Sequence, residues 1–124
     1  MYLYQTSIAG DIAVFKNCSK LWMIQVWICY NISGDISVLA NLPDLTYIDF
    51  YSHSNLSGDI STLSNCPKLQ YIRCWNCPAV YGSIDLLANL PELNHLQCGS
   101  TSVTGSVNSF INKTKLTYLA VNSS

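Results

Sequence analysis

Apolar and polar positions follow one pattern that returns every 23 or 24 residues along the chain. A leucine recurs with this spacing, at Leu21, Leu45, Leu69, Leu93 and Leu116. A glycine precedes each leucine by eleven residues, at Gly10, Gly34, Gly58, Gly82 and Gly105. Such a period is typical of a solenoid in which each unit is one supersecondary element. Five units fill the 124 residues, so the pattern predicts a single domain over 1–124.

The unit 45–68 shows which elements each repeat predicts. Its first part alternates apolar and polar residues with the period of two that is typical of a strand, so Ile48 and Phe50 point to one side. Apolar residues at intervals of three or four then turn the chain back across the core. The segment 61–65 predicts one short helical turn, with the side chain of Ser61 as its cap.

No unit can bury its own apolar face, so we expect neighbouring units to stack and form the core. Two further apolar ladders support this, one at Ile24, Ile48, Ile72, Leu96 and Leu119 and one at Ile12, Ile36, Ile60, Ile84 and Val107. Residues 1–4 align with the strand at 96–99, so the chain begins inside a strand. The sequence predicts an α/β repeat solenoid, with one parallel sheet of about six strands on its concave face and short helical or 3-10 turns on its convex side.

The segment 31–42, Asn-Ile-Ser-Gly-Asp-Ile-Ser-Val-Leu-Ala-Asn-Leu, carries a resemblance to a known family. The repeat resembles the leucine-rich repeat, in particular the internalin-like type of bacterial surface proteins, and the resemblance covers all 124 residues. The segment 55–60 is also similar to repeats of plant receptors. The resemblance implies a curved solenoid that binds a protein ligand through its strands, and it favours a cell-surface or secreted location.

Neither end of the chain shows a dedicated capping helix, although an open solenoid end exposes core and strand edge. Lys113 stands where other repeats place Cys18, Leu42, Cys66 and Leu90, so we expect the last turn to be partly solvated. We predict that the chain is a segment of a longer array. The alternative is end-to-end self-association with other copies.

The outward strand positions are unusually rich in aromatic residues. One column contains Met23, Tyr47, Tyr71, His95 and Tyr118, and another contains Tyr4, Trp27, Tyr51 and Trp75. Aromatic residues suit strands and stabilise neighbouring strands by stacking, so scaffolding alone explains some of them. It does not explain why a polar residue was so rarely used at positions that face solvent. Rigid amphipathic rings with a few polar groups between them are typical of a recognition surface.

We therefore predict a non-enzymatic module that binds a protein partner through this face. The predicted ligand-binding residues are Trp27, Tyr47, Asp49, Tyr51, Tyr71, Arg73, Trp75 and His95, with Asp49 and His95 as orienting groups. A carbohydrate is the alternative ligand, because sugar rings stack on tryptophan and tyrosine faces. A third hypothesis is a purely structural segment of a self-assembling fibre or array.

The cysteines and aspartates allow chemical alternatives that the repeat disfavours. Cys74 and Cys77 form a Cys-x-x-Cys, but each occupies a regular position of the repeat, so we predict structural thiols and no zinc site. A disulfide between Cys74 and Cys98 on neighbouring strands would be strained. Thiols of this kind suit a reducing or anaerobic setting, which leaves an intracellular location open. Aspartates after the glycines are expected to accept hydrogen bonds from the next turn rather than bind metal.

Composition excludes several functional classes. A formal net charge of −1 and a pI near 6 give no basic stripe for nucleic acid. No apolar stretch is long enough to span a membrane. The strand face offers no pair of carboxylates, no serine or cysteine nucleophile beside a histidine and no phosphate loop, so we predict no catalytic residues, no metal and no cofactor.

Overall fold

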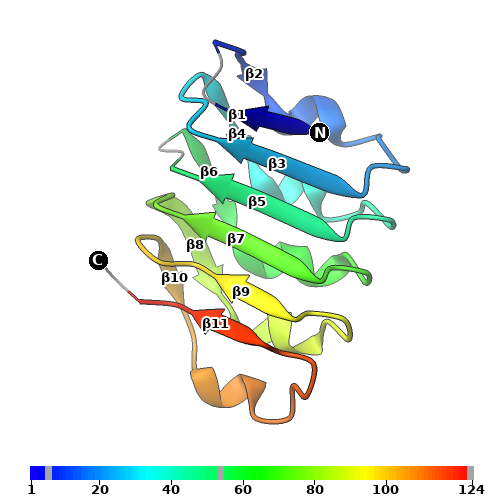
Figure 1. The fold of residues 1–124 in the computed structure, drawn as a ribbon, viewed down its shortest axis with the longest axis vertical. Coiled ribbons are helices and arrows are strands. Elements are labelled where there is room, and N and C mark those ends of the chain that lie inside the picture. The colour runs from blue at the N-terminus through cyan, green and yellow to red at the C-terminus, as the bar shows by residue number, and fades with distance from the viewer. Residues whose placement is uncertain (5–6, 53–54, 123–124) are drawn as a thin grey trace.

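The concave sheet of the solenoid contains one strand from each repeat. The computed structural model describes residues 1–4, 7–52 and 55–122. In those ranges the sheet has six parallel strands in the order β1-β3-β5-β7-β9-β11. Their bounds are β1 Tyr2–Tyr4, β3 Met23–Trp27, β5 Tyr47–Tyr51, β7 Tyr71–Trp75, β9 His95–Gln97 and β11 Tyr118–Ala120. Figure 1 shows these strands stacked one below another on the near side of the molecule. The prediction of about six strands in one concave sheet is confirmed.

The register of the sheet places equivalent positions of successive repeats beside each other. Met23 pairs with Tyr47, and Tyr47 pairs with Tyr71. The same register continues from Tyr71 to His95 and from His95 to Tyr118. Each outward column predicted from the sequence is therefore a continuous row on the sheet.

A second parallel sheet lies behind the first, and the sequence analysis missed it. Its strands run in the order β10-β8-β6-β4-β2 in the described part of the chain. Their bounds are β2 Gly10–Asp11, β4 Ile32–Asp35, β6 Leu56–Asp59, β8 Ala79–Ser83 and β10 Ser102–Thr104. These short segments contain glycine, serine and aspartate, which have low strand propensity. Stacking of the repeats, and not local preference, brings their backbones into hydrogen-bonding range.

Short 3-10 turns follow the strands of the second sheet, as Figure 1 shows. They span η1 Ile12–Phe15, η2 Ile36–Leu39, η3 Ile60–Asn65, η4 Asp85–Asn89 and η5 Val107–Phe110. The predicted cap of the third turn is wrong, because Ser61 donates its backbone N–H to Asp59 Oδ1 over 2.9 Å. Asp11 and Asp35 accept the equivalent bonds at 2.8 Å. The expected structural use of the aspartates is thus confirmed, and they supply the caps that were assigned to serine.

Gly34, Gly58 and Gly82 are each required by the capping aspartate of the preceding repeat. Gly58 has φ +120°, and a Cβ at this residue would overlap the carboxylate of Asp35. The backbone of Gly58 therefore passes directly over the Asp35 cap. Gly10 has a similar φ of +149° but nothing lies within 4 Å of the position of its Cβ. The Gly-Asp sequence thus recurs because each aspartate needs a neighbouring repeat without a side chain.

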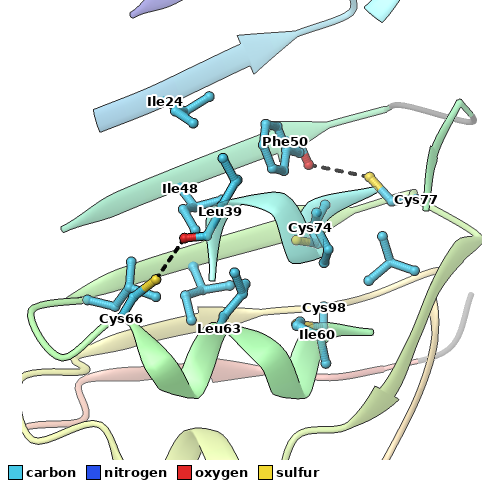
Figure 2. Close-up of a cluster of buried hydrophobic side chains, with 14 of the residues drawn as sticks. Ile24, Leu39, Ile48, Phe50, Ile60, Leu63, Cys66, Cys74, Cys77 and Cys98 are labelled. Atoms are coloured by element: carbon cyan, nitrogen blue, oxygen red, sulfur yellow. Dashed lines mark hydrogen bonds between the residues drawn. The ribbon is translucent and has the colours of Figure 1, made fainter. Parts of the chain in front are cut away.

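The core lies between the two sheets and the turns and is continuous along the solenoid. Figure 2 shows part of it, where Ile48, Phe50 and Leu63 are fully buried with the neighbouring cysteines. Cys66 Sγ donates to the Leu39 carbonyl over 3.1 Å and Cys77 Sγ donates to the Phe50 carbonyl over 3.6 Å. These thiols fill apolar space and satisfy carbonyls of the preceding repeat.

The six cysteines, all within the described ranges, are thiols and not disulfides. Burial raises the pKa of Cys66 to about 11 and that of Cys98 to about 12, so both are protonated at neutral pH. Cys18 is exposed, unlike Cys66 at the equivalent position, because it lies in the first turn of the stack. Among the described residues no helix has the length and apolar character needed to cross a membrane.

Candidate binding face

The outward side chains of the concave sheet form one face, which we call the concave face. Alternation along each strand directs every second side chain away from the core. Within the described strands of this sheet, Asp49 and Arg73 are the only residues with a formal charge. The face is otherwise aromatic and amide in character.

A continuous stack of rings runs across four strands of this face. The ring centroids lie 4.2 Å apart for Tyr47 and Tyr71, 4.0 Å for Tyr71 and His95, and 4.3 Å for His95 and Tyr118. The planes are inclined by only 9°, 14° and 4°. We call these four residues the ring stack. The parallel register imposes it, because each repeat adds one ring at the same height.

Mutual packing of the rings shifts their ionisation. Burial lowers the pKa of His95 below its ordinary value, although a hydrogen bond with Gln97 opposes this effect. Burial also raises the pKa of Tyr47 and Tyr71. His95 is therefore uncharged at neutral pH, and Tyr47 and Tyr71 keep their hydroxyl protons for donation.

A buried ion pair lies beside the ring stack. Arg73 Nε donates to Asp49 Oδ1 over 2.6 Å, and Gln25 Nε2 donates to Asp49 Oδ2 over 3.3 Å. The side chain of Asp49 is 1% exposed and that of Arg73 is 19% exposed. Asp49 is thus too deep to meet a partner directly, and its carboxylate helps to fix the position of Arg73.

The guanidinium of Arg73 is also held by two aromatic rings. Its Cζ lies 5.2 Å from the ring centre of Trp27 and 5.0 Å from that of Tyr51, within the range of cation–π attraction. Trp27, Ile28, Tyr51 and Arg73 line a shallow hollow on the concave face. We call it the arginine hollow. Arg73 reaches this place by extending from β7 across β5 towards β3.

Trp75 takes a different course and covers the next repeat. A Cβ at Gly99 would overlap the six-membered ring of Trp75. Gly99 is buried although it occupies an outward position of its repeat. The absence of a side chain at 99 therefore gives the indole a place to lie flat against the sheet.

The predicted binding residues thus form two neighbouring groups. Tyr47, Tyr71 and His95 belong to the ring stack, whereas Trp27, Tyr51 and Arg73 line the arginine hollow with Asp49 beneath them. Trp75 lies against Gly99.

The sequence analysis missed Ile28, which lines the hollow from just beyond the end of β3. Its position is outside the alternating strand, so the period of two gave no signal for it. Alignment of the repeats could have found it, because Ser52, Asn76 and Ser100 are polar at the same position.

Other parts of the molecule offer less for recognition. An apolar hollow at the β2 end of the stack is lined by the exposed side chains of Ile8 and Val14 together with the core residues Ile12 and Ile32. Within residues 1–4, 7–52 and 55–122, no three histidine, cysteine, aspartate or glutamate side chains are grouped to hold a metal ion.

Parallel strands in register, 24-residue repeats and an exposed strand face define the class of leucine-rich-repeat solenoids. Comparison with solved structures agrees with this assignment. The chain matches an internalin (InlF) from Listeria monocytogenes with a TM-score of 0.69 and 27% identity, over 97% of this chain and 34% of that one. It matches the leucine-rich-repeat ectodomain of the receptor kinase SOBIR1 from Arabidopsis thaliana with a TM-score of 0.69 and 17% identity, over 98% of this chain and 68% of the ectodomain.

A third match is the structure of PEPR1–AtPEP1, with a TM-score of 0.76 and 22% identity over 97% of this chain and 18% of that one. The chain is by its fold a leucine-rich-repeat protein, and internalins are among its structural neighbours. It spans about a third of the length of InlF. No family model matches the sequence, and no curated protein matches it.

Proposed function

We propose that this chain is a non-enzymatic module that binds a protein partner through its concave face. Its structural neighbours are leucine-rich-repeat proteins, and one of them, PEPR1, was solved together with AtPEP1. The ring stack and the arginine hollow lie on the same face and are adjacent. Together they offer apolar ring surface, tyrosine hydroxyls and one guanidinium.

The observation that carries the proposal is which groups cover the faces of the aromatic rings. Tyr71 and His95 have a neighbouring ring on both faces, whereas Tyr51 and Trp27 have the guanidinium of Arg73 against theirs. At Tyr71 and His95, what remains outward is ring edges and polar atoms. A protein partner contacts such edges and hydroxyls readily, as in interfaces rich in tyrosine. A sugar ring needs an open aromatic face, so the arrangement supports a protein over a carbohydrate.

The packing also makes the face rigid before it binds. A tyrosine between two parallel rings 4.0 and 4.2 Å away has little rotamer freedom left to lose. Fixing a flexible side chain at an interface costs about 0.5–1.5 kcal/mol, and the ring stack has met most of that cost on folding. This preorganisation supports binding as the role of the face beyond its contribution to stability.

The test places one lysine on the concave face and one elsewhere. Gln97 lies beside the ring stack on β9, and Asn89 is exposed at the end of η4. Binders are first selected from a phage library of random twelve-residue peptides on the unmodified protein. Gln97→Lys is expected to weaken the selected binders at least about tenfold, and Asn89→Lys is expected to leave them unchanged. Thermal unfolding of both variants should match the parent.

Other outcomes would redirect the proposal. Binders that tolerate Gln97→Lys and lose affinity in Asn89→Lys would move the site off the concave face. Retention on a glycan array with no selected peptide would favour a carbohydrate. Light scattering that grows with concentration, and that no concave variant changes, would favour the fibre or array segment.

A further inference from the structure

We propose that the arginine hollow binds one acidic side chain of the partner together with an apolar side chain next to it. This inference rests on the proposed function and names the chemistry of the segment that the concave face recognises. The occupant is an internal segment of a protein chain, in which an aspartate or glutamate stands beside an aliphatic residue.

The first argument is the direction of the guanidinium. Asp49 engages Nε of Arg73, and among the described residues the two terminal Nη groups make no hydrogen bond. Asp49 itself is 1% exposed, so a partner approaching the hollow meets the cation and not its counter-ion. No other side chain in the described strands of the concave face is cationic. A carboxylate is the group that pairs best with the free edge of a guanidinium.

The second argument is the strained residue on the wall of the hollow. Ile28 has φ 52°, in the left-handed region that a β-branched side chain rarely adopts. Ser52, Asn76 and Ser100 have φ 61°, 55° and 55° at the equivalent position of later repeats. The backbone therefore accepts serine or asparagine here, and the turn itself gives no reason for isoleucine.

The side chain of Ile28 is the aliphatic part of the lining, beside the rings of Trp27 and Tyr51. Strain of this kind persists where it serves a site, and here it adds apolar surface next to a cation. A polar residue at 28 would relieve the strain and remove that surface. The combination of one aliphatic wall, two ring edges and one guanidinium edge fits an apolar side chain with a carboxylate beside it.

The probes are three hexapeptides with acetylated and amidated ends. Their central pairs are Leu-Glu, Leu-Gln and Gly-Glu, with glycine at all other positions. Binding is followed by NMR through the indole N–H resonance of Trp27, identified by its loss in Trp27→Phe. The Leu-Glu peptide is expected to shift this resonance with a Kd of about 1 mM, as suits a ligand of this size. The Leu-Gln and Gly-Glu peptides should each bind at least about tenfold more weakly.

Two variants test the lining. Ile28→Asn copies the residue found at Asn76, so it should raise the midpoint of thermal unfolding by about 4 °C or more and weaken Leu-Glu about tenfold. Ser100→Asn introduces asparagine at the equivalent position three repeats beyond Ile28 and should alter neither quantity. Arg73→Gln, where it folds, should remove the preference for Leu-Glu over Leu-Gln.

The inference is overturned if Leu-Glu and Leu-Gln bind equally, or if neither binds. It is also overturned if Ile28→Asn raises stability and leaves Leu-Glu binding unchanged, because the isoleucine would then have no part in recognition. A fourth peptide that ends in a free leucine carboxylate separates the two sources of the charge. Binding of that peptide alone would assign the hollow to a chain terminus and refute an internal segment. In each of these outcomes the proposed function would still stand if the selected phage peptides lost affinity for Gln97→Lys.

Discussion

Removal of Arg73 should destabilise the protein more than removal of its partner Asp49. Arg73→Ala leaves the Asp49 carboxylate buried, with only the Gln25 amide at 3.3 Å to stabilise its charge. Loss of one member of a buried ion pair costs about 3–5 kcal/mol. In Asp49→Ala the side chain of Arg73 is already 19% exposed, and its guanidinium can turn towards water. We therefore expect this variant to lose about 1–3 kcal/mol of unfolding free energy. The double variant should be more stable than Arg73→Ala, because the uncompensated carboxylate is gone.

The assay is urea unfolding followed by circular dichroism, with thermal unfolding as a second measure. For a chain of 124 residues, 1 kcal/mol corresponds to about 4 °C, so Arg73→Ala should lower Tm by about 12–20 °C. Lys68→Ala is the matched control, because Lys68 pairs with Asp44 across the same 24-residue spacing but is 61% exposed. That variant should cost less than about 1 kcal/mol. The reasoning would be refuted if Arg73→Ala unfolded with a free energy within about 1 kcal/mol of the parent. It would also be refuted if the double variant were less stable than Arg73→Ala.

Three further predictions concern the scaffold. Gly58→Ala should destabilise the protein by at least about 1 kcal/mol more than Gly10→Ala. Both glycines have positive φ, but only a side chain at residue 58 displaces the Asp35 cap. Equal urea midpoints of the two variants would contradict this prediction. Folding lowers the pKa of His95, so the unfolded chain binds the proton more tightly and the free energy of unfolding should fall as the pH drops through 6.5. His95→Gln should flatten this pH dependence, and an unchanged slope of stability against pH would refute the prediction. Cys18 should be the one thiol that reacts rapidly with a thiol reagent in the native protein, whereas all six react in urea; several fast native thiols would disprove the burial of the rest.

The repeat pattern predicted most of the fold because its signals are local and repeated. The alternation in each unit assigned Ile48 and Phe50 to the core and Tyr47 and Tyr51 to the other face, and the structure confirms this. The same alternation put Asp49 on the outward side, although neighbouring side chains bury it there. Face assignment needs only the period of two, whereas exposure depends on what neighbouring repeats place above a residue.

The second sheet was missed, and the cap of the third turn was assigned to Ser61 in place of Asp59, for a related reason. Residues such as Ser57 and Gly58 have little strand propensity, and only their stacking on the neighbouring repeats brings their backbones into a ladder. Similarly, the sequence offered both Asp59 and Ser61 as caps of one turn. The extended backbone at Asp59 places its carboxylate on the Ser61 amide, and a serine inside the turn cannot reach that position.

The sequence by itself determined the number of repeats, the parallel register and the set of residues that face outward. These follow from a fixed repeat length and from the alternation of strand side chains, which are properties of short segments. Only the tertiary structure decided which outward residues act together. Arg73 extends across β5 towards Trp27 on β3, and Trp75 lies on Gly99, because long side chains bend along the sheet into whatever space adjacent repeats leave. That space depends on all the repeats at once, so the arginine hollow emerges only when the chain is folded, whereas the column of the ring stack already follows from the repeat.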